Sequence, residues 1–136
     1  VLAKILPHVD EFYTDLKIFD NDWHKKCTNV DNQVIKNNLK FLLQTDKKDC
    51  VIVRTPLIPT LTATKENIEQ ISRFISSCYD KVKYELLNYN PLAKAKYSYL
   101  DKKYYFTENP KLYSNAQLQF FYDIAKQNGI KNLIIE

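Results

Sequence analysis

Residues 50–57, CVIVRTPL, form a short apolar run, and an amphipathic stretch at 64–78 follows it. These two stretches together decide the fold class. A run of this length, rich in β-branched residues, is typical of a buried strand. The second stretch repeats its apolar residues at helical spacing, and Thr64 is a suitable N-cap. Similar strand-like runs lie at 11–17, 82–88 and 131–135. Together they indicate strands separated by helices.

Two further segments have helical spacing. Residues 32–44 keep their apolar side chains on one face. Ser114 and Gln117 form a capping box for a helix that ends before Gly129, the residue type that most easily takes a left-handed conformation. Residues 1–7 have the pattern of a helix end. This alternation predicts an α/β fold with a mostly parallel sheet of about four strands and flanking helices.

Composition narrows the function classes. The 136 residues suit one domain, and 45% hydrophobic with 26% charged residues suit a folded core. Gly129 is the single glycine, which excludes glycine-rich phosphate-binding loops. No apolar run reaches the roughly 20 residues of a membrane helix. The net charge of +4 is mild and dispersed, so neither a nucleic acid nor a membrane surface is expected as a partner.

The cysteines favour a reducing compartment. Cys27, Cys50 and Cys78 are far apart in the sequence and lack the spacing of a zinc site or a disulfide framework. A cytoplasmic location follows from this pattern. Cys50 and Cys78 lie in apolar patterns and are expected to be core thiols.

Polar side chains occur where the predicted strands end. In the first strand, alternation places Tyr13, Asp15 and Lys17 on one face. In the second, Arg54 shares a face with Cys50 and Ile52. Ligands of parallel α/β folds bind at this end of the sheet, so these residues are candidates for holding a ligand.

The third strand adds two amides. We expect Tyr84, Leu86 and Asn88 to share its face, with Asn90 just beyond. Lysine and arginine would bind an anion, and Asp15 would bind an ammonium group or a hydroxyl. Two structural interpretations stay open: an Asp15–Lys17 pair at a solvated strand end, and a structural salt bridge for Arg54.

Other chemistry-bearing residues have ordinary explanations. No nucleophile–base pair is apparent. We expect His8 at a helix end and His24 in a loop, each with a surface or capping role, and Trp23 as a loop anchor. Residues 89–113 form a long Lys- and Tyr-rich connection, within which 104–107 could pair as an antiparallel strand. Its interleaved lysines and tyrosines make single-stranded nucleic acid a weaker alternative ligand: Lys94, Lys96, Tyr97, Tyr99, Lys102, Lys103, Tyr104 and Tyr105.

Three segments resemble one enzyme family. Residues 10–17, DEFYTDLK, with His24 and then 28–32, TNVDN, are similar to the "D…DLK…H…TGVSN" segment of glycyl-radical-enzyme activating enzymes, of the pyruvate formate-lyase activating enzyme type. Residues 54–59, RTPLIP, resemble that family's "R-x-P-L-I-P-G". Residues 85–97, ELLNYNPLAKAKY, resemble its "ELLPYHxLGxxKY". The three matches follow the family's order over nearly the whole chain.

The resemblance implies a chemistry. Such enzymes are radical S-adenosylmethionine oxidoreductases of anaerobic metabolism with a partial (β/α)6 TIM-like barrel. A 4Fe–4S cluster cleaves S-adenosylmethionine, and the resulting radical abstracts a hydrogen from a glycine of a partner glycyl radical enzyme. By this likeness Asp15, Lys17 and Arg54 hold S-adenosylmethionine, with Asp15 also near a cation, and Asn90 stands where the family often has His.

The departures lead to further expectations. The family's "CxxxCxxC" motif is absent, so 1–136 is expected to be one domain, the C-terminal half of such a barrel without its cluster-binding half. No catalytic residue, metal ligand or bound cofactor is expected in this chain alone, which should be inactive. Asn29, Thr60 and Ala93 replace glycines common in the family. The alternative is a free-standing half-barrel that binds a partner protein or a small anion without radical chemistry.

An assembly expectation follows from the same template. The strand at 11–17 would have an open edge beside an inner face that bears Tyr13, Ile52 and Tyr84. Exposed edges recruit other strands, so the chain is expected to associate with itself as a two-fold dimer.

Overall fold

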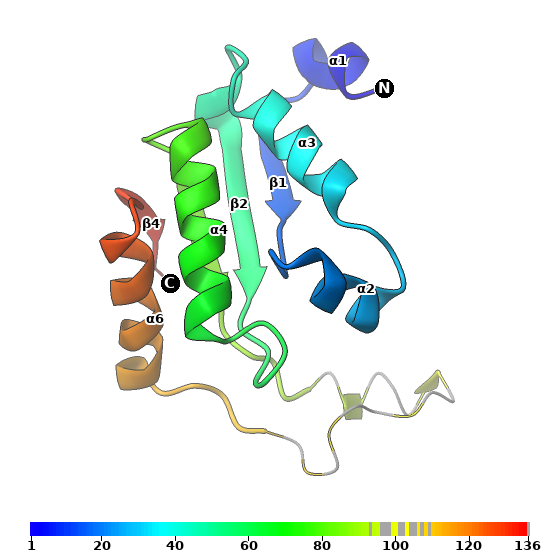
Figure 1. The fold of residues 1–136 in the computed structure, drawn as a ribbon, viewed down its shortest axis with the longest axis vertical. Helices are drawn as coiled ribbons and strands as arrows, with labels where there is room; N and C mark the ends of the chain where they lie inside the picture. The colour runs from blue at the N-terminus through cyan, green and yellow to red at the C-terminus, as the bar shows by residue number, and fades with distance from the viewer. Residues whose placement is uncertain are drawn as a thin grey trace.

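The computed structural model describes residues 1–92, 94–95, 99–100, 103, 106, 108 and 110–135. Strands and helices alternate along the chain (Figure 1). The strands are β1 (Phe12–Asp15), β2 (Val51–Pro56), β3 (Lys83–Leu87) and β4 (Asn132–Ile134). The α-helices are α1 (Leu2–Ile5), α2 (Asn21–Thr28), α3 (Gln33–Leu42), α4 (Lys65–Cys78) and α6 (Asn115–Gln127), with short 3-10 turns η1 (Leu6–His8) and η2 (Lys48–Cys50).

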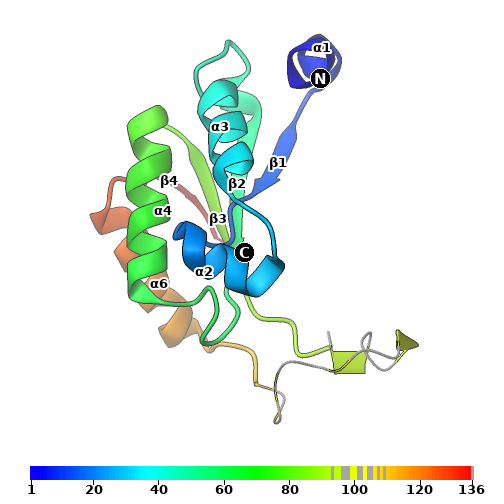
Figure 2. The ribbon, with the colours of Figure 1, turned by 45° about the vertical axis from the view of Figure 1, so that its right-hand side comes forward.

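The four strands form one parallel sheet in the order β1-β2-β3-β4. Each strand is thus joined to its spatial neighbour through at least one helix, as parallel pairing requires. The α/β fold class predicted from the alternation is confirmed. All strands point toward the end of the sheet where α2 and the described parts of the segment between β3 and α6 lie (Figures 1 and 2).

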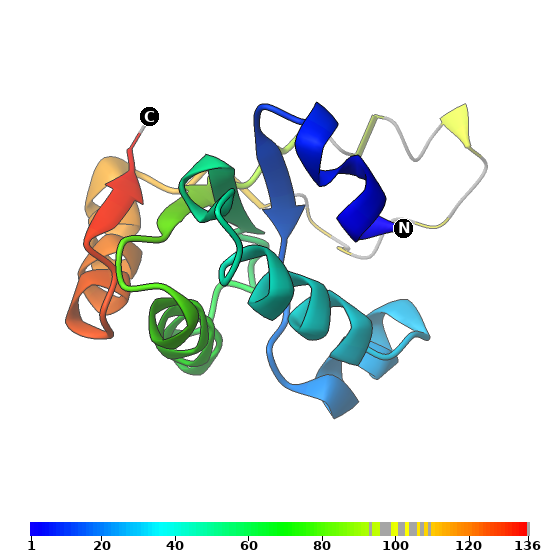
Figure 3. The ribbon, with the colours of Figure 1, turned by 90° about the horizontal axis from the view of Figure 1, so that it is seen from above.

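The core lies between one face of the sheet and three helices. Seen from above, α3, α4 and α6 flank the sheet (Figure 3). Their apolar stripes pack against strand residues that alternate toward them, as amphipathic helices do on a sheet. The core includes Phe12, Val53, Tyr84, Leu39, Ile71, Ile75, Phe121 and Ala125. The expected alternation of β1 is confirmed, because Phe12 and Leu16 are buried while Tyr13 and Lys17 are exposed.

The sequence pattern did not predict helix α2. Its sequence, NDWHKKCT, has no apolar stripe. The helix instead depends on its ends: the Asp20 carboxylate caps it by accepting from the Trp23 N–H at 2.7 Å, and Asn29 ends it in the left-handed region. His24 and Trp23 therefore lie in a helix and not in a loop, which corrects the expectation for His24.

The sheet face that bears Tyr13, Ile52 and Tyr84 was expected to be exposed, but only one of these three side chains is exposed. Tyr13 is 53% exposed, but Ile52 is buried and Tyr84 is fully buried. The reason for Tyr84 is register: it pairs with Val53 and therefore shares the helix-covered face, whereas Tyr13 pairs with Ile52 on the other face.

Two of the positions where the family often has glycine have left-handed backbones. Asn29 has φ 60° and Thr60 has φ 65°. Asparagine tolerates this region, but a β-branched residue does so only with strain. Gly129 also needs its glycine, because its φ is 104° and a Cβ there would lie 2.6 Å from Ser76 Oγ. Ala93 lies outside the described residues, as do Tyr104, Tyr105 and Thr107 of the possible antiparallel strand and Lys96, Tyr97 and Lys102 of the Lys- and Tyr-rich segment.

Replacing Thr60 with glycine should stabilise the chain. Thr60 is exposed, so Thr60→Gly removes backbone strain without losing a packing contact, and the gain should exceed the added entropy of the unfolded chain. We expect a net gain of about 1 kcal/mol in the free energy of unfolding, measured by urea denaturation. Asn29→Gly is the matched control and should gain less. A Thr60→Gly variant less stable than the native chain would contradict this.

Candidate functional site

A row of three charged side chains crosses the sheet near its carboxyl end. Asp15 of β1 pairs in register with Arg54 of β2, and Arg54 pairs in register with Glu85 of β3. The Arg54 Nε donates to Asp15 Oδ1 at 3.0 Å, and these two side chains are 32% and 35% exposed. Residues opposite each other in a sheet share a face, so Glu85 lies on the same face as this ion pair.

The salt bridge left open for Arg54 is present in this row, and the binding of a ligand there stays a prediction. Asp15 forms its ion pair with Arg54 and, among the described residues, none with Lys17. The pair is reachable from solvent, as a ligand site requires. Within the described part of the chain, the single hydrogen bond of the Arg54 guanidinium is the one from Nε. Its terminal amino groups therefore remain able to bind an anion.

Tyr84 and Leu86 share a face of β3, as predicted, but it is not the face that bears Tyr13, Asp15 and Arg54. Tyr84 and Leu86 point into the helix-covered core, where the Tyr84 hydroxyl donates to Thr55 Oγ1 at 2.8 Å and Thr55 donates to the Leu16 carbonyl at 2.7 Å. This burial raises the pKa of Tyr84. Glu85 is the residue of β3 that lies beside Arg54, so alternation counted from Glu85 gives the correct face. Sequence reasoning missed Glu85 although it stood in the matched motif.

Asn88 has a structural role. Its side-chain amide donates to the Tyr113 carbonyl and its carbonyl accepts from the Tyr113 N–H, both at 3.0 Å. The pair of bonds fixes the chain just before α6 against the end of β3. Asn88 is therefore not available to the charged row, contrary to the expectation that grouped it with the candidate site.

Two buried asparagines hold the chain that leaves β1. Asn67 of α4 donates to the carbonyls of Lys17 and Thr62 at 2.8 and 2.9 Å and accepts from the Phe19 N–H at 2.9 Å. Asn32, just before α3, donates to the carbonyls of Ile18 and Phe19. These bonds fix the backbone of Lys17, whose side chain is exposed at the same end of the sheet.

The loop after β2 is held in place at the carboxyl end of the sheet. The Thr62 hydroxyl donates to the Pro56 carbonyl and accepts from the Ile58 N–H, which closes the loop on itself. Trp23 Nε1 donates to the Leu61 carbonyl at 3.0 Å. Trp23 thus anchors a loop, as expected, although it does so from helix α2.

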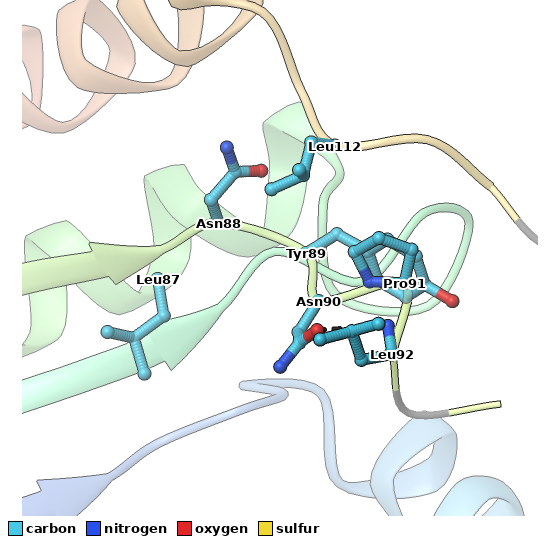
Figure 4. Close-up of a pocket in the computed structure, with 7 residues that line it drawn as sticks. All are labelled: Leu87, Asn88, Tyr89, Asn90, Pro91, Leu92 and Leu112. Carbon is cyan, nitrogen blue, oxygen red and sulfur yellow. Dashed lines mark hydrogen bonds between the residues drawn. The ribbon is translucent and has the colours of Figure 1, made fainter. Parts of the chain in front are cut away.

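Asn90 lies in a depression beyond β3. The depression has a volume of about 500 Å³ and is lined by Leu87, Asn88, Tyr89, Asn90, Pro91, Leu92 and Leu112 (Figure 4). Asn90 Oδ1 accepts from the Leu92 N–H at 2.9 Å, which fixes the turn at Pro91. Figure 4 shows the side chains of Leu87 and Asn90 on one side of the backbone and those of Asn88 and Leu112 on the other. Among the described residues, Asn90 makes no hydrogen bond to Asp15, Lys17 or Arg54.

The remaining candidate residues have structural surroundings. His24 is buried, with Nδ1 2.8 Å from the Val30 carbonyl, so it links α2 to the chain before α3. His8 is exposed in η1. Cys78 packs against the core and Cys50 is half-buried, whereas Cys27 is exposed. In the described ranges no three His, Cys, Asp or Glu side chains gather as a metal site would require.

Over the same ranges, every helix is too short or too polar to cross a membrane.

The fold has a close solved counterpart. It matches the crystal structure of a domain of pyruvate-formate lyase-activating enzyme from Bacteroides vulgatus with a TM-score of 0.72 and 20% sequence identity, over 99% of this chain and 72% of that one. At this identity the match establishes the fold alone: an α/β arrangement of a parallel four-stranded sheet with flanking helices.

Sequence relatives establish the family. The chain is 34% identical to the indoleacetate decarboxylase activating enzyme of Tractidigestivibacter scatoligenes, over 98% of this chain and 41% of that enzyme. It is 29% identical to the 4-hydroxyphenylacetate decarboxylase activating enzyme of Clostridioides difficile, over 96% of this chain and 40% of that enzyme. No family model matches. The chain belongs to the glycyl-radical-enzyme activating enzymes and spans about two fifths of the length of these relatives.

Removing the Asn67 amide should lower the stability of the chain, because this amide holds several backbone groups at the carboxyl end of the sheet. Asn67→Ala leaves the Phe19 N–H and the Lys17 carbonyl without this partner in a partly buried place, and the Thr62 carbonyl without it in a buried one. We expect a loss of about 2–4 kcal/mol in the free energy of unfolding, measured by urea denaturation. The exposed Asn38 of α3 provides the control, since Asn38→Ala should change stability by less than about 0.5 kcal/mol. A loss below about 1 kcal/mol for Asn67→Ala would show that water replaces these bonds.

Proposed function

We propose that this chain is the part of a radical S-adenosylmethionine activating enzyme that holds the methionine end of S-adenosylmethionine at the open end of a half-barrel. The single observation that carries the proposal is the Asp15–Arg54 pair, anchored at 3.0 Å yet one-third exposed, on a strand end where ligands of parallel α/β folds bind. The two sequence relatives described above support the proposal, since both are named as activating enzymes.

The residues present fit S-adenosylmethionine. Its carboxylate suits the terminal amino groups of Arg54, which form charge-assisted hydrogen bonds. Its ammonium group and ribose hydroxyls suit Asp15, and Lys17 supplies a second cation at the same end of the sheet. Asn90, on the side of the backbone that faces away from Asn88, offers an amide to either kind of group. These four residues are the proposed binding set.

The chemistry that S-adenosylmethionine supplies, together with a reduced 4Fe–4S cluster, is removal of a hydrogen atom from a glycine of a partner enzyme. The three separated cysteines of this chain do not fit such a cluster. We therefore propose that 1–136 corresponds to the C-terminal portion of the barrel and that the cluster ligands belong to a preceding segment. The partner would be a glycyl radical enzyme, as the names of the relatives imply, and the compartment the cytoplasm, as the cysteine pattern indicates.

The test compares this chain with a longer one. Both are given iron and sulfide, reduced without oxygen, and assayed for 5′-deoxyadenosine. We expect product only from a chain extended upstream through a CxxxCxxC motif. In that chain Arg54→Gln should raise the KM for S-adenosylmethionine about 10-fold or more, because a charge-assisted hydrogen bond is lost. Stability should fall by less than about 1 kcal/mol, since the ion pair is partly solvated.

The chain's other arginine is the matched control. Arg73 of α4 donates to Asn128 Oδ1 at 2.8 Å on the exposed helical side, so Arg73→Gln should leave that KM unchanged. An unaltered KM in Arg54→Gln would place the ligand elsewhere. Product from the 136-residue chain alone would contradict the division of the barrel. A gene without CxxxCxxC upstream would favour the alternative, a half-barrel that binds a partner or a small anion.

We also propose that the 136-residue chain associates with itself. Strand β1 is an edge strand of the described sheet, and Tyr13 beside it is more than half exposed. Because open edges and exposed aromatic side chains recruit other chains, light scattering at micromolar concentration should give a dimer. The longer chain, in which a preceding strand would cover β1, should be monomeric. A monomeric short chain would show that this edge does not recruit a partner.

A further inference from the structure

Tyr13 contacts the arginine of the candidate site. The Arg54 guanidinium carbon lies 5.1 Å from the centre of the Tyr13 ring. Alternation along β1 puts Tyr13 and Asp15 on the same face, and register places Tyr13 beside Ile52 and Asp15 beside Arg54. The Arg54 side chain therefore has two separate contacts with β1: its Nε bonds Asp15, and its guanidinium lies over the ring of Tyr13.

Two contacts restrict a guanidinium far more than one does. An arginine held by one hydrogen bond through Nε still rotates about its side-chain bonds, and it loses rotamer entropy when a ligand fixes it. A cation over an aromatic ring is attracted to the electron-rich face of the ring, also at an exposed site. The ring therefore limits that rotation before a ligand arrives, which leaves the terminal amino groups in a restricted set of directions.

We propose that Tyr13 is a positioning residue for anion binding by Arg54, which makes Arg54 ready to receive the carboxylate of a ligand at the end of the sheet. The assignment rests on the proposed function for the identity of that ligand, but the contact itself does not. Position 13 falls in the part of the segment at 10–17 that the family pattern leaves open, so the proposal does not follow from that pattern.

The surroundings of Tyr13 keep its phenol group in the neutral, protonated form. Its pKa is raised, first by the hydrogen bond with Glu11, then by partial burial and by the charges of Glu11 and Glu85, while Arg54 lowers it. The phenol therefore stays protonated near neutral pH. Leucine at this position would offer neither the ring face nor the polar end.

Nuclear magnetic resonance of the 136-residue chain tests the contact without any cofactor. The signal of the Arg54 Nε–H reports how firmly the side chain is held. In Tyr13→Leu we expect its exchange with solvent to become about 2- to 5-fold faster, because the ring contact is lost. Tyr13→Phe keeps the ring and should preserve slow exchange. Phe120→Leu is the matched control, since Phe120 is 55% exposed, close to the 53% of Tyr13, but lies on α6.

The functional half of the test uses the longer, cluster-containing chain. Tyr13→Leu should raise the KM for S-adenosylmethionine about 2- to 5-fold with kcat unchanged, and Tyr13→Phe should restore it. If Tyr13→Leu leaves the solvent exchange of the Arg54 Nε–H unchanged, the proposal for Tyr13 is overturned. The proposed function is then still tested separately by Arg54→Gln. Faster exchange with an unchanged KM would also overturn the proposal for Tyr13, since the ring would then support the arginine without serving binding. Should Tyr13→Leu fail to fold, Tyr13→Gln replaces it in both measurements.

Discussion

The parallel register of β1, β2 and β3 is the constraint on which the rest of the molecule depends. Because Asp15, Arg54 and Glu85 are directly opposite one another, three charges from distant parts of the chain share one face at one height of the sheet. A slip of one residue in any strand would send its charge into the helix-covered core. The buried Tyr84–Thr55–Leu16 hydrogen bonds on the opposite face oppose such a slip, since they join all three strands.

The loops at this end of the sheet are built from asparagine and threonine in place of glycine. With Gly129 as its single glycine, the chain closes the loop after β2 through Thr62 and fixes the exit of β1 through Asn32 and Asn67. Side-chain amides bind neighbouring backbone groups at defined angles, so they specify one loop path where glycine would allow several. The left-handed Thr60 shows the cost, because its backbone keeps a conformation that a β-branched residue disfavours.

Much of this could be read from the sequence, and the errors have physical causes. Each predicted strand contains the observed one. The signal is clearest for β2, which is buried along most of its length and begins with a continuous apolar run. Helix α2 was missed because it is held by its caps at Asp20 and Asn29, and periodicity detects only apolar stripes. The face of β3 was misassigned because the polar Asn88 alternates in step with Tyr84 and Leu86, and because register with β2 is a long-range property. Asp15 and Arg54 were found because a charge in a buried strand is costly without a partner.

The Asp15–Arg54 pair is proposed to serve binding more than folding. A partly solvated ion pair contributes little to stability, because each charge keeps much of its hydration in the unfolded and folded states alike. An arginine already aligned by a carboxylate and an aromatic ring, however, loses less entropy when a second anion arrives. The Nε bond to Asp15 also uses the one N–H that a bidentate ligand at the terminal amino groups does not need. The same pair can thus stay formed while a carboxylate binds, so that Asp15 keeps Arg54 aligned throughout.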